Sequence, residues 1–150
     1  MISWSDHVVF MESIVFKYDV DGDDFTSAGE ASTDMKQKLR KLGIDSNIIR
    51  RCAICMYEGE INMVIHANGG VIEVHVCESN ITMILKDTGP GIEDVDQAMS
   101  EGYSTATNSI RELGFGAGMG LPNMKKNSDK ITVESVPGVG TTVTIIVNLI

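Results

Sequence analysis

Glu58 and Asn62 are the two polar side chains of this sequence whose spacing best suits chemistry. They lie four residues apart in a helical pattern that is apolar almost all round, IIRRCAICMYEGEINMVIH, so most of this helix is expected to be buried. At 3.6 residues per turn the two side chains are only about 40° apart, and His66 continues the same face. A buried carboxylate and a buried amide are costly unless they are paired, bound to a metal or open to a solvated cleft.

Two interpretations of this pair are open. In the first, Glu58 and Asn62 hydrogen-bond each other or a loop backbone. In the second, Asn62 gives an oxygen to Mg²⁺, which takes few protein ligands beside phosphates and water, and Glu58 orients or deprotonates a nucleophile in phosphoryl transfer. Glu60 lies about 200° from Glu58 around the helix and is expected to have different surroundings. His66 by itself is typical of a core or surface histidine.

A second motif, DTGPGI, begins at Asp87, where an apolar strand pattern ends. A carboxylate held there only accepts hydrogen bonds, so it can accept one from the exocyclic amino group of adenine. The glycines let the backbone pass close to a base. A turn aspartate before a tight loop is the alternative. The nucleotide-binding residues predicted from this motif are Asp87, Gly89, Gly91 and Ile92.

A third motif is the glycine-rich run GFGAGMGL, which opens a helix with Pro122 in its first turn. Free backbone N–H groups at such a helix start bind phosphate. The run lacks the G-K-[ST] of a Walker loop and does not follow a strand as a dinucleotide fingerprint does. A flexible loop without a ligand is the alternative. The predicted phosphate-binding residues are Gly114, Gly116, Ala117, Gly118, Met119, Gly120 and Leu121.

These motifs must be positioned by strands and helices that alternate along the chain. Short turns join the predicted strands, so the sheet is expected to be mostly antiparallel. We therefore predict an α+β fold, a two-layer α/β sandwich with the helices on one face, formed by residues 1–150 as a single domain. The expected elements are a strand (8–20), a helix (27–42), the motif helix (from Asp45 or Ser46 to Gly69), a hairpin (71–76 and 81–87), a short helix (93–101), a loop (102–118), a helix (119–127) and a second hairpin (130–136 and 141–149).

The composition, 43% hydrophobic and 22% charged, is that of an ordinary globular protein. No apolar run approaches the ~20 residues that span a bilayer, and the acidic N-terminal stretch is unlike a secretory signal, so we expect a cytoplasmic protein without membrane contact. A net charge of −9 argues against nucleic-acid binding. Cys52, Cys55 and Cys77 lack the partners of a zinc site or a disulfide framework and are expected to be reduced, packed thiols.

Together and in this order, the motifs resemble those of the GHKL ATPase superfamily, which includes gyrase, the heat-shock chaperone, histidine kinases and the mismatch-repair ATPase. The resemblance covers roughly residues 48–147 and implies a Bergerat-type fold that binds ATP with Mg²⁺. Glu58 and Asn62 match the N box of the family, the Asp87 motif its G1 box and the glycine run its G2 box. Thr141 and Thr142 match its final Gly-Thr-Thr, and the resemblance implies that one of them helps Asp87 to hold the adenine.

Three stretches resemble small anti-sigma regulatory factors and switch serine/threonine kinases: EGEINMVIHANGG, DTGPGIEDVDQAMSEGYST, and GFGAGMGLPNMKKNSDKITVES followed by GTTVTI. This implies a kinase with Glu58 as the catalytic base and Mg²⁺ on Asn62, which phosphorylates a STAS-domain partner. The alternatives are an ATP-gated module that captures a sigma factor or another regulator, and a plain ATPase. Small relatives often dimerise, so a homodimer is one expected state. The stretch Ala106–Leu113 is an insert that lengthens the predicted lid over the phosphates.

Overall fold

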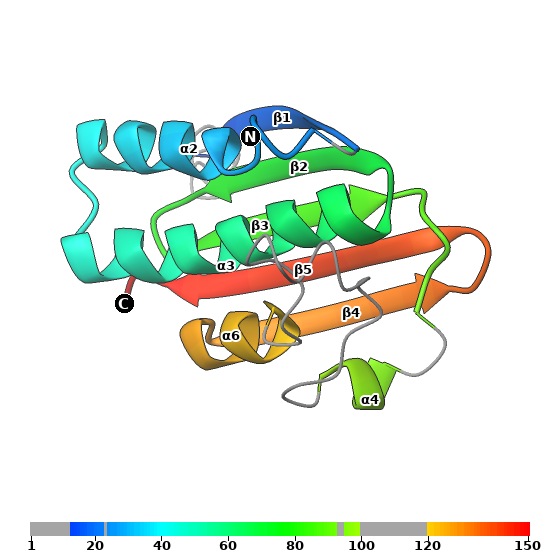
Figure 1. The fold of residues 1–150 in the computed structure, drawn as a ribbon. Coiled ribbons are helices and arrows are strands. Elements are labelled where there is room, and N and C mark those ends of the chain that lie inside the picture. Colours follow the sequence, from blue (N-terminus) through cyan, green and yellow to red (C-terminus); the bar gives the residue numbers. More distant parts are fainter. Residues whose placement is uncertain (1–12, 23, 93–94, 100–119) are drawn as a thin grey trace, which may run out of the picture.

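The computed structural model describes residues 13–22, 24–92, 95–99 and 120–150 of the chain. The described strands form one antiparallel sheet in the order β1-β2-β3-β5-β4, and helices α2, α3 and α6 lie along one face of it (Figure 1). The predicted two-layer α+β fold is therefore confirmed. The elements are β1 (Ile14–Asp21), α2 (Glu30–Lys41), α3 (Ser46–His66), β2 (Gly69–Val76), β3 (Asn80–Asp87), α4 (Val95–Ala98), α6 (Gly120–Asn127), β4 (Lys130–Val136) and β5 (Gly140–Asn148).

Most of the predicted boundaries agree with the structure to within a few residues. The first strand begins at Ile14, and the predicted residues 8–12 lie outside the described part of the chain. Of the predicted helix 93–101, the structure describes residues 95–99, and α4 covers Val95–Ala98; residues 93, 94, 100 and 101 lie outside the described part of the chain. The predicted loop 102–118 falls wholly among the residues that the structure does not describe.

The core lies between the sheet and the helices, and the central strands β2, β3 and β5 bury about every second residue. In the register of β3 against β5, Ile81 faces Val147, and Met83 faces Ile145, and all four side chains are buried. The intervening threonines and isoleucines point to the uncovered face of the sheet. This period of two explains why β-branched runs in the sequence form these strands.

Helix α3 crosses the central strands closely because Gly59 has no side chain. A Cβ atom added to Gly59 would overlap the side chain of Leu85 on β3. The helix begins at Asp45, whose carboxylate accepts a hydrogen bond from the Asn47 backbone N–H at 3.0 Å. Glycine costs about 1 kcal/mol in the middle of a helix, and here it permits the close contact that sets the height of α3 above the sheet.

Candidate functional site

Glu58 and Asn62 lie on the side of α3 that faces α6, and both are half-buried. Asn123 of α6 donates a hydrogen bond from Nδ2 to Glu58 Oε1 at 3.3 Å. A Cβ atom added to Gly120 would lie 2.8 Å from Asn62 Nδ2, so the first residue of α6 sits directly against this amide. The structure thus brings together Glu58, the predicted catalytic base, Asn62, the predicted metal ligand, and the start of α6.

Asp87 ends β3 and holds two segments of backbone with one carboxylate oxygen. Its Oδ1 accepts hydrogen bonds from the backbone N–H of Gly89 at 2.9 Å and of Thr141 at 3.2 Å. No described residue hydrogen-bonds Oδ2 of the same carboxylate. The side chain is therefore fixed in orientation while one acceptor oxygen stays available.

The loop after Asp87 is tied to the β4–β5 hairpin by Ser135. The backbone N–H of Ile92 donates to Ser135 Oγ at 2.6 Å, and that hydroxyl lies 2.8 Å from Thr141 Oγ1. A hydrogen bond of 2.7 Å from the backbone N–H of Gly138 to the carbonyl oxygen of Pro90 joins the same two segments. Sequence reasoning missed Ser135, because its position opposite Thr141 appears only once β4 and β5 are paired in register.

The two predicted threonines lie on opposite faces of the sheet. Thr141 is buried on the helix-covered face, within the network of Asp87, whereas Thr142 follows it on the uncovered face, between Lys86 and Glu134 in the strand register. Successive residues of a strand alternate in this way. The sequence left the choice between the two threonines open, and the strand register leaves Thr142 outside the candidate site.

The motif helix and Asp87 meet at one end of the sheet, at Gly70. Gly70 pairs with Asp87 between β2 and β3. A Cβ atom added to Gly70 would lie 3.0 Å from Asp87 Cα and 2.5 Å from the methyl carbon of Met63, the neighbour of Asn62 on α3. The C-terminal part of α3 and the end of β3 therefore border the same region, as binding of one ligand by both motifs requires.

Part of the predicted glycine run can be placed. The side chain of Leu121 is buried in the core, which leaves its backbone as the only group able to meet a ligand. Gly91 and Ile92 lie in the loop beside the β4–β5 hairpin. Gly114, Gly116, Ala117, Gly118, Met119 and the insert Ala106–Leu113 lie outside the described residues.

Glu60 has a different environment from Glu58, as the helical period predicted. It is 2% exposed, and its carboxylate accepts from the backbone N–H groups of Gly29 at 2.8 Å, Ala31 at 3.2 Å and Ser32 at 3.1 Å. Gly29 has no side chain with which to cap α2, so this carboxylate from α3 performs that function. The sequence carried no signal for this contact, which joins residues about thirty positions apart.

The cysteines of α3 are packed thiols, as predicted. Cys52 and Cys55 are buried and free, and desolvation by burial raises the pKa of each thiol to about 12. In the part of the chain that the structure describes, no group of three or more His, Cys, Asp or Glu side chains could hold a metal ion. Among the described helices, none is long and apolar enough to cross a membrane.

The sequence from residue 46 to residue 149 matches the family described as histidine kinase-, DNA gyrase B-, and HSP90-like ATPase. An anti-sigma F factor of Caldanaerobacter subterraneus is 35% identical over 98 residues, which is 65% of this chain and 61% of that protein. The serine/threonine-protein kinase RsbT of Bacillus subtilis is 29% identical over 106 residues, 68% of this chain and 74% of RsbT. The chain thus spans about three-fifths of the length of the anti-sigma F factor that it matches.

Solved structures share the fold. The RsbU and RsbW domains of Rv1364c from Mycobacterium tuberculosis superpose with a TM-score of 0.61 at 15% identity, over 89% of this chain and 32% of that one. The SiaB–SiaC complex from Pseudomonas aeruginosa contains a chain with a TM-score of 0.62 at 8% identity, over 97% of this chain and 96% of that one. Fold, motifs and sequence similarity agree, and the resemblance to anti-sigma factors and switch kinases is confirmed. The chain belongs to the histidine kinase-, DNA gyrase B- and HSP90-like ATPase family.

Proposed function

We propose that this chain is a cytoplasmic, ATP-dependent serine/threonine protein kinase of the anti-sigma type, which phosphorylates a STAS-domain partner. The observation that carries the proposal is the position of the half-buried Glu58. Its carboxylate accepts a hydrogen bond from Asn123, and it lies one turn of α3 from Asn62, which contacts the first residue of α6. Similarity to RsbT, named a serine/threonine-protein kinase, and to anti-sigma F factors supports the same reading.

The residues present fit a nucleotide. Asp87 keeps Oδ2 available in the described structure, and its other oxygen is fixed by two backbone N–H groups, so it can accept a hydrogen bond from adenine in a defined direction. Gly120 leaves room beside Asn62 that a larger residue would fill. The backbone N–H groups at the start of α6 can then approach a phosphate closely.

The chemistry assigned to this pocket is transfer of the γ-phosphoryl group to a serine or threonine hydroxyl. Asn62 would hold Mg²⁺ through its amide oxygen, and the ion would supply positive charge beside the phosphates. Glu58 accepts the proton of the hydroxyl as the new P–O bond forms and the bond between the β- and γ-phosphates breaks, which releases ADP. A positioned base of this kind contributes about 10²- to 10⁴-fold in rate.

Transfer from labelled ATP to the STAS-domain proteins of the same genome tests this proposal. We expect Glu58→Gln to bind ATP as the original chain does and to lose at least about 100-fold in transfer. We expect Asp87→Asn to lose ATP binding in calorimetric titration. One carboxylate oxygen is replaced by an N–H₂ group, which donates and cannot accept the hydrogen bond from adenine. Glu78→Gln, an exposed change in the β2–β3 turn, is the matched control. Transfer to none of these proteins, or normal ATP binding by Asp87→Asn, would contradict the proposal.

A second candidate function is an ATP-gated module that sequesters a sigma factor without obligatory catalysis. The similarity to proteins named anti-sigma F factor favours it. Co-purification of a sigma factor in the presence of ATP distinguishes the two functions, if it is measured for the original chain and for Glu58→Ala. Capture that survives Glu58→Ala, with no transfer by the original chain, supports the binding module. ATP turnover in the absence of any partner protein supports a plain ATPase instead.

A further inference from the structure

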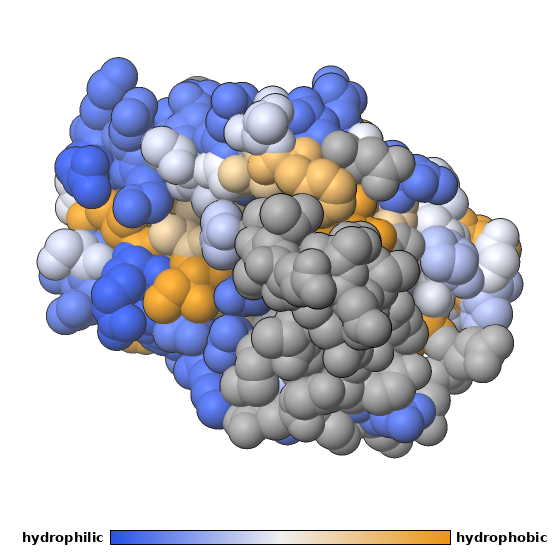
Figure 2. All heavy atoms as spheres, viewed as in Figure 1, coloured by the Kyte–Doolittle hydropathy of each residue, from blue (hydrophilic) through white to orange (hydrophobic). Residues whose placement is uncertain are grey.

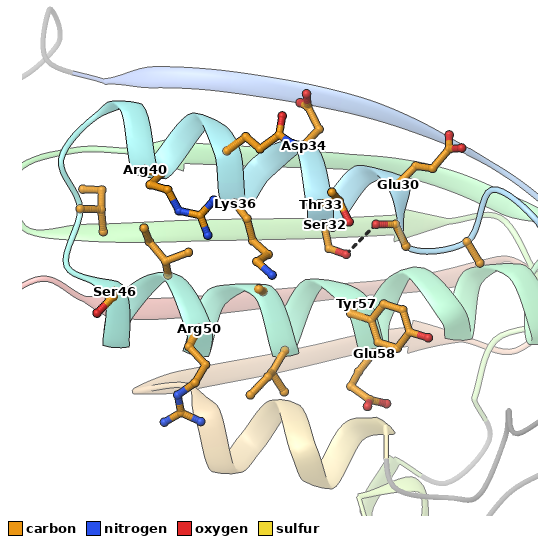
Figure 3. Close-up of a pocket in the computed structure, with 17 residues that line it drawn as sticks. Glu30, Ser32, Thr33, Asp34, Lys36, Arg40, Ser46, Arg50, Tyr57 and Glu58 are labelled. Carbon is orange, nitrogen blue, oxygen red and sulfur yellow. Dashed lines mark hydrogen bonds between the residues drawn. The ribbon is translucent and has the colours of Figure 1, made fainter.

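A groove with a volume of about 920 Å³ runs along α2 and α3. Glu58, the proposed catalytic base, lies at one end of it, whereas neither Asn62 nor Asp87 lines it, so the groove adjoins the proposed nucleotide pocket at Glu58 and extends away from it (Figure 3). Figure 2 shows apolar surface between hydrophilic atoms over these two helices. The apolar lining comes mainly from α3 and consists of Ala28, Ile44, Ile49, Ala53, Ile54 and the ring of Tyr57.

Three cations line the groove, and Arg40 and Arg50 lie toward the start of α3, with Lys36 farther along. Figure 3 shows Lys36 and Arg40 extending from α2 toward α3, and Arg50 extending from α3 on its other side. Within the described residues, none of the three forms an ion pair, whereas Lys38 pairs with Asp34 at 2.8 Å. In the part of the chain that the structure describes, three cations without an ion pair thus line one groove, together with the acidic residues Glu30, Asp34 and Glu58.

We propose that this groove binds an amphipathic helix of a protein partner, with the acidic side chains of that helix over Lys36, Arg40 and Arg50. Two packed helices leave a surface groove that accepts the apolar stripe of a third helix. Carboxylates beside these cations would gain charge-assisted hydrogen bonds at the rim, which favour the correct partner and speed its encounter. Helix α2 has 12 residues and is about 18 Å long, so a helix of similar length would follow the groove.

The groove is held in shape before any ligand binds. Glu60 of α3 is bonded to three backbone N–H groups at the start of α2, which fixes one wall of the groove to the other. Preformed walls reduce the entropy that binding must overcome. This inference deepens the proposed function, because it rests on the existence of a protein partner and assigns a docking surface that leads to Glu58.

Fluorescence anisotropy with a designed peptide tests the inference on the intact chain. The probe is a labelled peptide of about 14 residues, with leucines at positions i, i+3, i+4 and i+7 and glutamates elsewhere, and its counterpart has lysines in place of the glutamates. We expect the glutamate peptide to bind, and to bind more weakly as salt is added. The double variant Arg40→Glu/Arg50→Glu should weaken its binding by about tenfold or more. Lys36→Gln/Arg40→Gln, which only removes charge, should weaken it less.

The matched control is Lys17→Glu/Lys130→Glu, which makes the same change of charge at exposed positions of the sheet. Equal weakening by this control, equal binding of the lysine peptide, or absence of binding to the original chain would overturn the inference. Binding of a single-stranded oligonucleotide as tightly as the glutamate peptide would also overturn it. So would a dimer of the original chain, seen in analytical ultracentrifugation, that Arg40→Glu/Arg50→Glu dissociates and the control variant does not. Calorimetric titration with ATP is run on every variant. Absence of ATP binding by the original chain counts against the proposed function. ATP binding by the original chain without any binding of the glutamate peptide counts against the groove alone.

Discussion

The two sides of α3 carry the same residue type in opposite circumstances. On the side facing α2, Glu60 is 2% exposed and accepts three backbone hydrogen bonds. On the side facing α6, Glu58 is half-buried, and the one hydrogen bond it receives from a described residue is long, at 3.3 Å. A carboxylate whose acceptor sites are filled by backbone stabilises the fold, whereas one with open acceptor sites can take up a proton. The surroundings therefore separate a structural glutamate from a candidate catalytic one, two residues apart.

The largest expected effect that tests this comparison is the loss of stability in Glu60→Ala. Three backbone N–H groups, two of them buried, would lose a charged acceptor and a cavity would form, so we expect the free energy of unfolding to fall by about 3 kcal/mol or more. Urea denaturation measures it, and alkylation of the buried thiols of Cys52 and Cys55 gives a second readout. Glu58→Ala should change stability by less than about 1 kcal/mol. Similar losses in both variants would remove the distinction between the two sides.

The next effect concerns the side of α3 that faces α6. In Gly120→Ala the new methyl group would press on the amide of Asn62, because its Cβ would lie 2.8 Å from Nδ2. We expect ATP in the presence of Mg²⁺ to bind about tenfold more weakly, or about 1.4 kcal/mol, while the unfolding midpoint barely moves. Calorimetry and thermal denaturation on the same sample provide both values. Unchanged affinity would mean that Asn62 does not contribute to nucleotide binding.

A smaller effect contrasts two ways of capping a helix. Helix α3 is capped by Asp45, an exposed neighbour in sequence, and α2 by the remote and buried Glu60. Asp45→Ala should cost about 1 kcal/mol, since it removes a single hydrogen bond that water can partly replace. Chemical denaturation beside Glu60→Ala provides the comparison. If Asp45→Ala lowers the free energy of unfolding as much as Glu60→Ala does, burial does not make the cap by Glu60 more stabilising than the cap by Asp45.

The smallest effect depends on pH and involves Asp34, which joins α2 to β1. Hydrogen bonds from Lys38 and Tyr18 lower the pKa of the Asp34 carboxyl below its usual range. Since the folded-state pKa is the lower one, the contribution to stability is present above the unfolded pKa of about 3.9 and is lost as the pH falls through the folded value. The site is nearly half exposed, so Asp34→Asn should cost below about 0.5 kcal/mol at neutral pH. Unfolding curves of the two chains should converge in acid, and a difference that grows in acid would contradict this assignment.

Local sequence patterns predicted most of the fold and half of the site. The four-residue spacing of Glu58 and Asn62, and the period of two in the strands, depend on repeat geometry that any helix or strand must follow. The same periodicity separated Glu60 from Glu58 before its partners were known. Boundaries and motifs were readable because the turns, caps and glycines that define them are neighbours in the chain.

The amino-acid sequence by itself determined the elements, their order, the family motifs and the acidic character of the chain. Only the tertiary structure decided that Glu60 caps α2, that Ser135 ties the Asp87 loop to the hairpin, that Thr141 rather than Thr142 hydrogen-bonds Asp87, and that three cations line one groove. The physical reason is the range of the interactions. Propensity and periodicity act over a few residues, whereas these contacts join residues brought together only when helices pack on the sheet and strands pair in one register.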